Sequence, residues 1–234
     1  MMLRFYIFNI VGFLNQIYSN LMVKLMHPLF QSLQAGTQAM QLDLPETTLL
    51  RLLQYQDQLV LWNKAFNLTA IRDPKEMLVK HLLDSLSIIQ HLPKGRLLDI
   101  GTGGGMPGFI VALVEPEREC VLLDSNGKKI RFLRQVSADM KVSNAKPVQS
   151  RIEDTEILKQ LGQFDVVTSR AFASLSDFVS AGQPFLKPHG HFAAMKGIIP
   201  QDELEQLTHY QQQVIALQVP RLDEQRHLIL LQPS

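Results

Sequence analysis

Apolar positions recur along this 234-residue chain with a helical period in its first part and as short continuous runs afterwards. Between residues 28 and 91, leucines recur at spacings near three and four, so each expected helix has one apolar face. Glu46 after a proline suits the first turn of one helix, and Asp73 with Pro74 predicts the cap and first turn of another. We expect residues 62–72, dense in asparagine and aromatic side chains, to form a packed loop or to shape a substrate cleft.

Continuous apolar runs from residue 97 onward are bounded by turn residues, which is typical of strands buried on both faces. Helical patterns alternate with these runs, so they predict a mainly parallel sheet. The first four expected strands are Leu97–Ile100, Cys120–Asp124, Ala145–Gln149 and Phe164–Ser169. Later we expect a helix over 175–185, a strand over 190–195, a helix over 203–211 and two final strands, the last being 227–231, antiparallel to its neighbour.

A glycine-rich turn, GTGGGMPG at 101–108, joins the first strand to an apolar helix. Glycines accept positive φ and let a ligand approach the backbone, and the following helix directs its first amides toward that ligand. Met106 stands where a dinucleotide-binding GxGxxG has its third glycine, and the sequence contains no GxxxxGK[ST]. The remaining GxGxG pattern is typical of S-adenosylmethionine-dependent methyltransferases, with a purely structural turn as the alternative.

Composition narrows the class of protein. An apolar content of 46% is enough for the core of one α/β domain with an appendage. The formal net charge of +1 provides no global basic field, so an RNA substrate would need a local basic patch. The single Cys120 excludes an intrachain disulfide, is expected in the core, and suggests a reducing, cytoplasmic compartment. The histidines are scattered, and we expect no metal site.

Residues 1–26 form an apolar stretch that several asparagines interrupt, so we expect neither a membrane span nor stable membrane association. Three later methionines offer alternative starts, which favours an extension, from a misassigned start, over a helix on a membrane surface. We therefore expect this extension, then a helical cap over 27–92, then a methyltransferase domain over 93–234. We expect the protein to be a monomer.

Side chains at or just beyond the ends of the second and third strands suit a nucleoside. Asp124 ends the second strand 23 positions beyond Gly101, where a carboxylate accepts hydrogen bonds from both hydroxyls of a ribose; capping the next helix is the alternative. Ile152 follows the third strand, where an apolar side chain packs on adenine. Glu153 and Asp154 have the alternative role of capping the helix after them.

The helix that opens at residue 127 is rich in cations. Lys128, Arg131 and Arg134 share one face, and Lys129 lies beside them. This face is either solvated surface or a contact for RNA phosphates.

The end of the fourth strand, SRAFA at 169–173, would lie next to the transferable methyl group. Enzymes that methylate exocyclic amines place Asp or Asn followed by Pro-Pro and an aromatic residue here, and those that methylate pyrimidine carbon use a cysteine nucleophile. This chain has neither. A ring nitrogen such as guanine N7 has an exposed lone pair and needs alignment rather than a general base, so the sequence favours a ring nitrogen as the acceptor.

Taken together, the motifs resemble the RsmG (GidB) family of methyltransferases that act on guanosine N7 of 16S ribosomal RNA. They are WNKAFNLTAIRD (62–73), HLLDSL (81–86), DIGTGGGMPG (99–108), LLDSNGKK (122–129), QSRIED (149–154), SRAFASL (169–175) and QRHLILL (225–231). The resemblance runs from about residue 40 to the end and implies a Rossmann-like class I fold, with a seven-stranded, mostly parallel sheet and an N-terminal helical cap. It also implies S-adenosylmethionine as cofactor and the 30S subunit as partner.

Carried over by position, the resemblance implies cofactor contacts at Gly101, Met106, Ile152, Glu153 and Arg170, with Asp124 at the ribose from its place in the fold. Gly103 is a further candidate from its place in the glycine turn. Arg170 is also the one candidate for a catalytic role, and holds either the methionine carboxylate or an RNA phosphate. Lys128, Lys129, Arg131, Lys196 and Arg226 are the candidates for RNA contact. Rival hypotheses are a small-molecule methyltransferase and a noncatalytic nucleotide-sensing or membrane-associated protein that keeps the fold.

Overall fold

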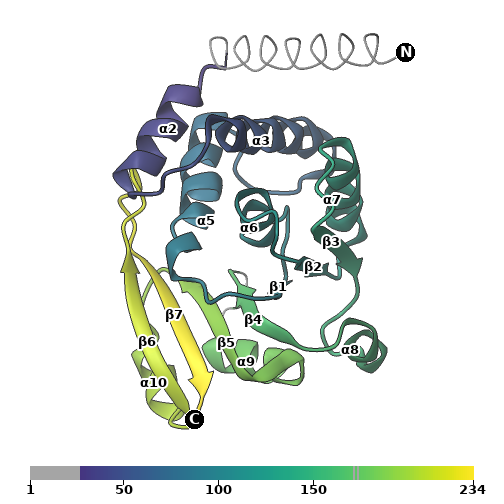
Figure 1. Cartoon of the computed structure of the whole chain (residues 1–234), viewed down its shortest axis with the longest axis vertical. Helices are drawn as coiled ribbons and strands as arrows, with labels where there is room; N and C mark the ends of the chain where they lie inside the picture. Colours follow the sequence, from purple (N-terminus) through teal and green to yellow (C-terminus); the bar gives the residue numbers. More distant parts are fainter. Residues whose placement is uncertain (1–26, 171, 173) are drawn as a thin grey trace, which may run out of the picture.

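Seven strands form one sheet at the centre of the computed structural model, which describes residues 27–170, 172 and 174–234 (Figure 1). Their order is β3-β2-β1-β4-β5-β7-β6, and β7 runs antiparallel to both neighbours. This confirms the expected seven-stranded, mostly parallel sheet. The strands are β1 (Leu97–Ile100), β2 (Cys120–Asp124), β3 (Ala145–Gln149), β4 (Phe164–Ser169), β5 (Leu186–Lys196), β6 (Tyr210–Leu217) and β7 (Arg226–Pro233). The expected extension over 1–26 lies outside the described residues.

Helices precede the sheet and connect its strands. Before β1 the chain forms α2 (Phe30–Ala39), α3 (Glu46–Phe66), α4 (Pro74–Met77), the π-helical η1 (Leu78–Leu83), α5 (Asp84–Leu86) and the 3-10 helix η2 (Ile89–His91). Between and after the strands lie α6 (Gly108–Val114), α7 (Gly127–Asp139), α8 (Thr155–Leu161), α9 (Leu175–Gly182), the 3-10 helix η3 (Gln183–Phe185) and α10 (Gln201–Gln206).

The central strands β1, β2 and β4 are buried on both faces, since successive residues point to opposite sides and nearly all of them are buried. Leu97 packs in the core shared with α2, α3, α6 and α7, whereas Leu98 packs in the core shared with α8, α9 and α10. Leu122 and Leu123 of β2 divide between the two cores in the same way. Figure 1 shows these two groups of helices on opposite sides of the sheet. Helices α2 and α3, which precede the sheet, therefore belong to one of its covering layers.

Helix α3 begins where the sequence predicts and ends later than expected. Glu46 is its first residue, directly after Pro45, and Asn67 closes it in the left-handed region at φ 50°. Residues 62–66 are helical rather than part of a loop, because Trp62 and Phe66 lie four positions apart and pack together at 5.1 Å between ring centroids. Asp73 caps α4 through its side chain, as predicted.

Two boundaries in the last third differ from the expectation. Helix α10 ends at Gln206, and residues 210 and 211, expected in a helix, begin β6. The glutamines of this segment carry no apolar period, and they adopt a strand because β6 adds to the edge of the sheet along β7. Strand β5 extends four residues before the expected start, pairing through Leu186 with Phe164 ahead of an irregularity in the ladder.

Candidate active site

The glycine turn lies at the carboxyl edge of the sheet, between β1 and α6. Gly101 has φ +69° and Gly105 has φ +107°, conformations that side chains rarely adopt. The Gly101 amide donates to the Leu123 carbonyl at 2.8 Å, which fixes the turn against the end of β2. The turn therefore holds its backbone beside the edge where ligands bind in sheets of this topology.

Asp99 supports the glycine turn from inside the fold. Its Oδ2 accepts from Thr102 Oγ1 at 2.6 Å and from the Gly108 amide at 2.8 Å. Its Oδ1 is buried and has no hydrogen-bond partner among the described residues. Burial, the largest cause, raises the pKa of Asp99 from its ordinary 3.8 to about 7.

This shift predicts a pH dependence of stability. Between about pH 4 and pH 7 the folded protein retains a proton on Asp99 that the unfolded chain has lost, so this group lowers the free energy of unfolding as pH rises. Asp99→Asn removes the titration and keeps an acceptor. We expect the stability of the wild type relative to this variant to fall between about pH 5 and pH 8 in urea unfolding. If the free energies of unfolding of the wild type and the variant differ by the same amount at both pH values, the raised pKa of Asp99 is contradicted.

Asp124 joins the glycine turn to the next helix. Its Oδ2 accepts from the Gly103 amide at 2.9 Å, and its Oδ1 accepts from the Asn126 amide at 2.8 Å. The side chain of Asn126, rather than Asp124, caps α7 by accepting from the Lys128 amide. Of the two roles open to Asp124, the N-cap is therefore taken by its neighbour. Its carboxylate lines a pocket instead.

That pocket brings together most of the residues expected at a nucleoside. It has a volume of about 250 Å³. Its lining comprises Ile100, Gly101, Leu123, Asp124, Ser125, Ser150, Arg151, Ile152, Glu153 and Phe172. Ile152 is half-buried and Glu153 is exposed, both in the turn between β3 and α8. Asp154 caps α8 by accepting from the Glu156 amide, so Glu153 is not the cap. Apolar side chains and a carboxylate in one pocket fit the adenosine of S-adenosylmethionine.

Arg170 and Met106 lie together outside the lining of this pocket. Arg170 directly follows β4, and its Nη1 donates to the Lys80 carbonyl at 2.9 Å and to Asp84 Oδ2 at 3.0 Å. Its Nη2 lies 3.7 Å from the sulfur of Met106, which is buried in the glycine turn. The arrangement places a guanidinium against the glycine turn at the end of β4.

Helix α3 holds the glycine turn through a residue that the sequence analysis did not single out. The hydroxyl of Tyr55 donates to the Gly104 carbonyl at 2.6 Å, and its ring stacks on Phe109 at 5.0 Å between centroids. Tyr55 is fully buried, and burial raises the pKa of its hydroxyl. Its place on the apolar face of α3 indicated burial, but nothing in the sequence indicated the partner.

Tyr55→Phe should loosen this turn without removing the ring. Losing the hydroxyl leaves the Gly104 carbonyl unpaired, which costs about 1–3 kcal/mol. We expect isothermal titration calorimetry to show S-adenosylmethionine affinity about threefold to tenfold weaker. Tyr210→Phe is the matched control, since that hydroxyl also donates at 2.6 Å, to Gln183 far along the sheet. Equal affinity in both variants would argue against a role of Tyr55 in holding the turn.

The expected RNA contacts fall into two groups at the same edge of the sheet. Lys128 and Arg131 are exposed on α7, and Arg131 lines a hollow with Arg134. Lys129 instead points toward Asp124, with its Nζ 3.7 Å from Asp124 Oδ2. The second group is at the ends of β5 and β7.

In this second group, Lys196 is the last residue of β5 and donates to the Phe172 carbonyl at 2.8 Å. Arg226 is the first residue of β7, and its Nε donates to Asp84 Oδ1 at 3.1 Å. Lys196 pairs with His227 in the ladder, so the two cations come from adjacent strand ends. Figure 1 shows α7 and β7 on opposite sides of the sheet centre, so the two groups flank the glycine turn.

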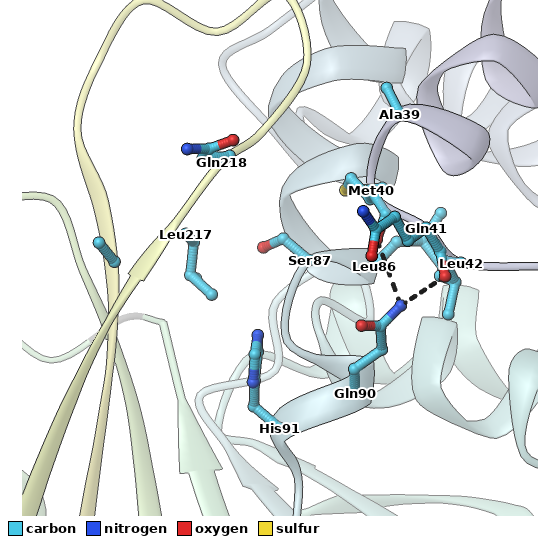
Figure 2. Close-up of a pocket in the computed structure, with 11 residues that line it drawn as sticks. Ala39, Met40, Gln41, Leu42, Leu86, Ser87, Gln90, His91, Leu217 and Gln218 are labelled. Carbon is cyan, nitrogen blue, oxygen red and sulfur yellow. Dashed lines mark hydrogen bonds between the residues drawn. The ribbon is translucent and has the colours of Figure 1, made fainter.

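A second pocket, of about 210 Å³, lies away from these residues (Figure 2). It is bounded by the end of α2, by η2 and by the end of β6. Gln90 lines this pocket, and its side-chain amide donates to the carbonyls of Met40 and Gln41, at 3.2 and 2.9 Å. None of the residues expected at the cofactor or the RNA lines it.

Among residues 27–170, 172 and 174–234, no three His, Cys, Asp or Glu side chains are grouped to hold a metal ion. No helix in those ranges combines the length and apolarity needed to cross a bilayer. Cys120 is fully buried in β2, as expected, and burial raises the pKa of its thiol.

Comparison with known proteins gives the family. The family model described as rRNA small subunit methyltransferase G (GidB) matches residues 48–229. The chain belongs to this family. A ribosomal RNA small subunit methyltransferase G of Acinetobacter baylyi is 65% identical over 208 residues, which are 88% of this chain and 98% of the relative. That of Psychrobacter cryohalolentis is 56% identical over 182 residues, covering 77% and 74%. The GidB family assignment confirms the resemblance seen in the motifs.

Solved structures confirm the fold of this GidB family member. A methyltransferase from Geobacter sulfurreducens has a TM-score of 0.52 at 13% identity and covers 78% of this chain and 88% of that one. Fibrillarin of Aeropyrum pernix, solved with natively bound S-adenosylmethionine, has a TM-score of 0.51 at 15% identity, covering 64% and 72%. At such low identities the likeness concerns the fold alone, which is the Rossmann-like methyltransferase fold expected from the sequence.

Proposed function

We propose that this chain transfers a methyl group from S-adenosylmethionine to N7 of a guanosine in 16S ribosomal RNA of the small subunit. The observation that supports this best is the pocket in which Gly101, Asp124, Ile152 and Glu153 meet, in a chain of the small-subunit methyltransferase G family. The ribosomal substrate would make the cytoplasm its place of action.

Three residues of the pocket, together with Arg170 outside it, have a part in holding the cofactor. Asp124 accepts hydrogen bonds from the ribose hydroxyls while the Gly103 and Asn126 amides hold its carboxylate in place. Ile152 packs on the adenine, and Glu153 is an acceptor at the rim. Arg170 binds the methionine carboxylate from the far side of the glycine turn. When bound, the cofactor supplies a methyl group made electrophilic by its sulfonium.

The protein contributes alignment rather than proton transfer. Guanine N7 attacks through its in-plane lone pair and carries no proton, so no side chain has to act as base. Five cations on both sides of the glycine turn are proposed to hold the RNA by contacts to its phosphates: Lys128, Lys129, Arg131, Lys196 and Arg226. The rate of methyl transfer then depends on how firmly the protein holds the cofactor and the RNA in alignment with each other.

The direct test is transfer of labelled methyl from S-adenosylmethionine by the purified protein. The substrates to compare are 30S subunits lacking the modification, protein-free 16S RNA and free guanosine nucleotides. We expect incorporation into ribosomal RNA, recovered as 7-methylguanosine after nuclease digestion, and none into free nucleotides. Incorporation into small molecules alone would overturn the proposal.

A further inference from the structure

Two arginines from different strands share one buried carboxylate of the helices before the sheet. Arg170 follows β4, and Arg226 begins β7. Asp84, the first residue of α5, is 2% exposed. Its Oδ2 lies 3.0 Å from Arg170 Nη1, and its Oδ1 lies 3.1 Å from Arg226 Nε. Each oxygen therefore serves a different guanidinium, and α5 and β7 lie side by side in Figure 1.

Lys80 in η1 extends this arrangement. Its carbonyl accepts from Arg170 Nη1 at 2.9 Å, and its ammonium lies 3.2 Å from a carboxylate oxygen of Glu224, two residues before Arg226. Lys80 and Asp84 are four positions apart, so the carbonyl and the carboxylate meet the same guanidinium. Turns of π-helix such as η1 are frequent at functional sites.

The cluster of Asp84, Arg170 and Arg226 carries surplus positive charge. One carboxylate balances one guanidinium, and the side chains of Arg170 and Arg226 remain 26% and 24% exposed. Arg226 donates through Nε to Asp84 and through Nη1 to the Gln225 carbonyl, so Nη2 has no partner among the described residues. The accessible N–H donors of two neighbouring guanidiniums are suited to an anionic group.

We propose that Asp84 is a positioning residue that holds Arg170 and Arg226 in one arrangement, so that the methionine carboxylate and an RNA phosphate are bound together. This rests on the proposed function. The sequence suggested each arginine as a separate contact, and the structure joins them through a third residue. Asp84 touches neither reactant and acts only through the two guanidiniums.

The geometry makes one substitution decisive. In Asp84→Asn the amide keeps the shape of the carboxylate, but its oxygen serves one arginine while its NH₂ group faces the donors of the other. In an Arg226→Met background only Arg170 needs an acceptor, and the asparagine oxygen suffices. The effect of Asp84→Asn must therefore depend on which residue is at position 226.

The test is a double-mutant cycle on methyl transfer to 30S subunits. We expect Asp84→Asn alone to lower kcat/KM about tenfold, mainly through a higher KM for the RNA. In a protein that already carries Arg226→Met, adding Asp84→Asn should lower kcat/KM by less than about threefold. Glu119→Gln is the matched control, since Glu119 bridges Arg96 and Lys146 at the far end of β2. It should leave KM unchanged. Equal factors in both backgrounds, or a loss in kcat alone that follows a lower Tm, would overturn the proposal.

Cofactor affinity gives a second readout that needs no RNA. The same four proteins can be titrated calorimetrically with S-adenosylmethionine. Asp84→Asn alone should weaken cofactor binding, whereas adding it to Arg226→Met should weaken binding much less. An additive pattern here would also overturn the positioning role. If the wild type binds the cofactor but does not methylate 30S subunits, the proposed function fails while this cycle still decides the role of Asp84.

Discussion

Asp124→Ala is expected to weaken S-adenosylmethionine binding by at least about a hundredfold. The variant loses the acceptor for the ribose hydroxyls and the group that holds the Gly103 amide. Hydrogen bonds to a charged group contribute about 1.5–3 kcal/mol each, and about 2.8 kcal/mol corresponds to a hundredfold. Calorimetric titration measures the effect, and Asp124→Asn, with one acceptor oxygen left, should fall between the alanine variant and the wild type.

Asp139→Ala is the matched control for this substitution. Asp139 lies at the other end of α7, where it is exposed and accepts from Gln135 at 2.8 Å. We expect its loss to leave cofactor affinity unchanged, as should Cys120→Ser if that variant folds. If Asp124→Ala binds within about threefold of the wild type, the ribose assignment is wrong.

Arg170→Ala is expected to lower kcat/KM for ribosomal RNA by about a hundredfold or more. The substitution removes the cation beside the glycine turn and leaves the Lys80 carbonyl without its donor and Asp84 with a single arginine. Arg170→Lys keeps the charge but not the two-pronged geometry, so we expect an intermediate loss. Initial rates of methyl transfer at varied cofactor and RNA concentrations measure both.

Arg51→Ala separates this effect from the general loss of an arginine. Arg51 on α3 donates to the Met140 carbonyl at 3.2 Å and does not line the pocket that contains Asp124. It should keep kcat/KM within about threefold. A loss as large as that of Arg170→Ala would indicate that activity follows folding rather than the site.

The strands were predictable because their signals are local. The first four predicted strands, among them Cys120–Asp124, match the observed boundaries. Three of them are largely buried apolar segments bounded by turn residues, whereas β3 is only partly buried. The edge strand β6 was harder, because its glutamine-rich start lacks an alternating pattern and forms a strand only by pairing with β7. Its structure depends on a partner distant in sequence.

The residues of the candidate site likewise divide into those marked by local sequence and those that depend on a partner distant in sequence. The glycine turn, Asp124 and Ile152 are marked by their positions after strands, and one pocket contains Gly101 with both of them. Tyr55 and Asp84 were not predicted as site residues, because each acts on a group 49 or 86 positions away. Helical periodicity indicates that such residues are buried but not which backbone carbonyl or guanidinium they meet.

The most direct test of the central claim is nucleoside mass spectrometry of 16S ribosomal RNA from cells with and without this gene. We expect 7-methylguanosine to disappear from one site in the mutant, and purified protein with S-adenosylmethionine to restore it on isolated 30S subunits. An unchanged 7-methylguanosine profile would contradict methyl transfer to guanosine N7 and favour a small-molecule substrate or a sensor with the same fold.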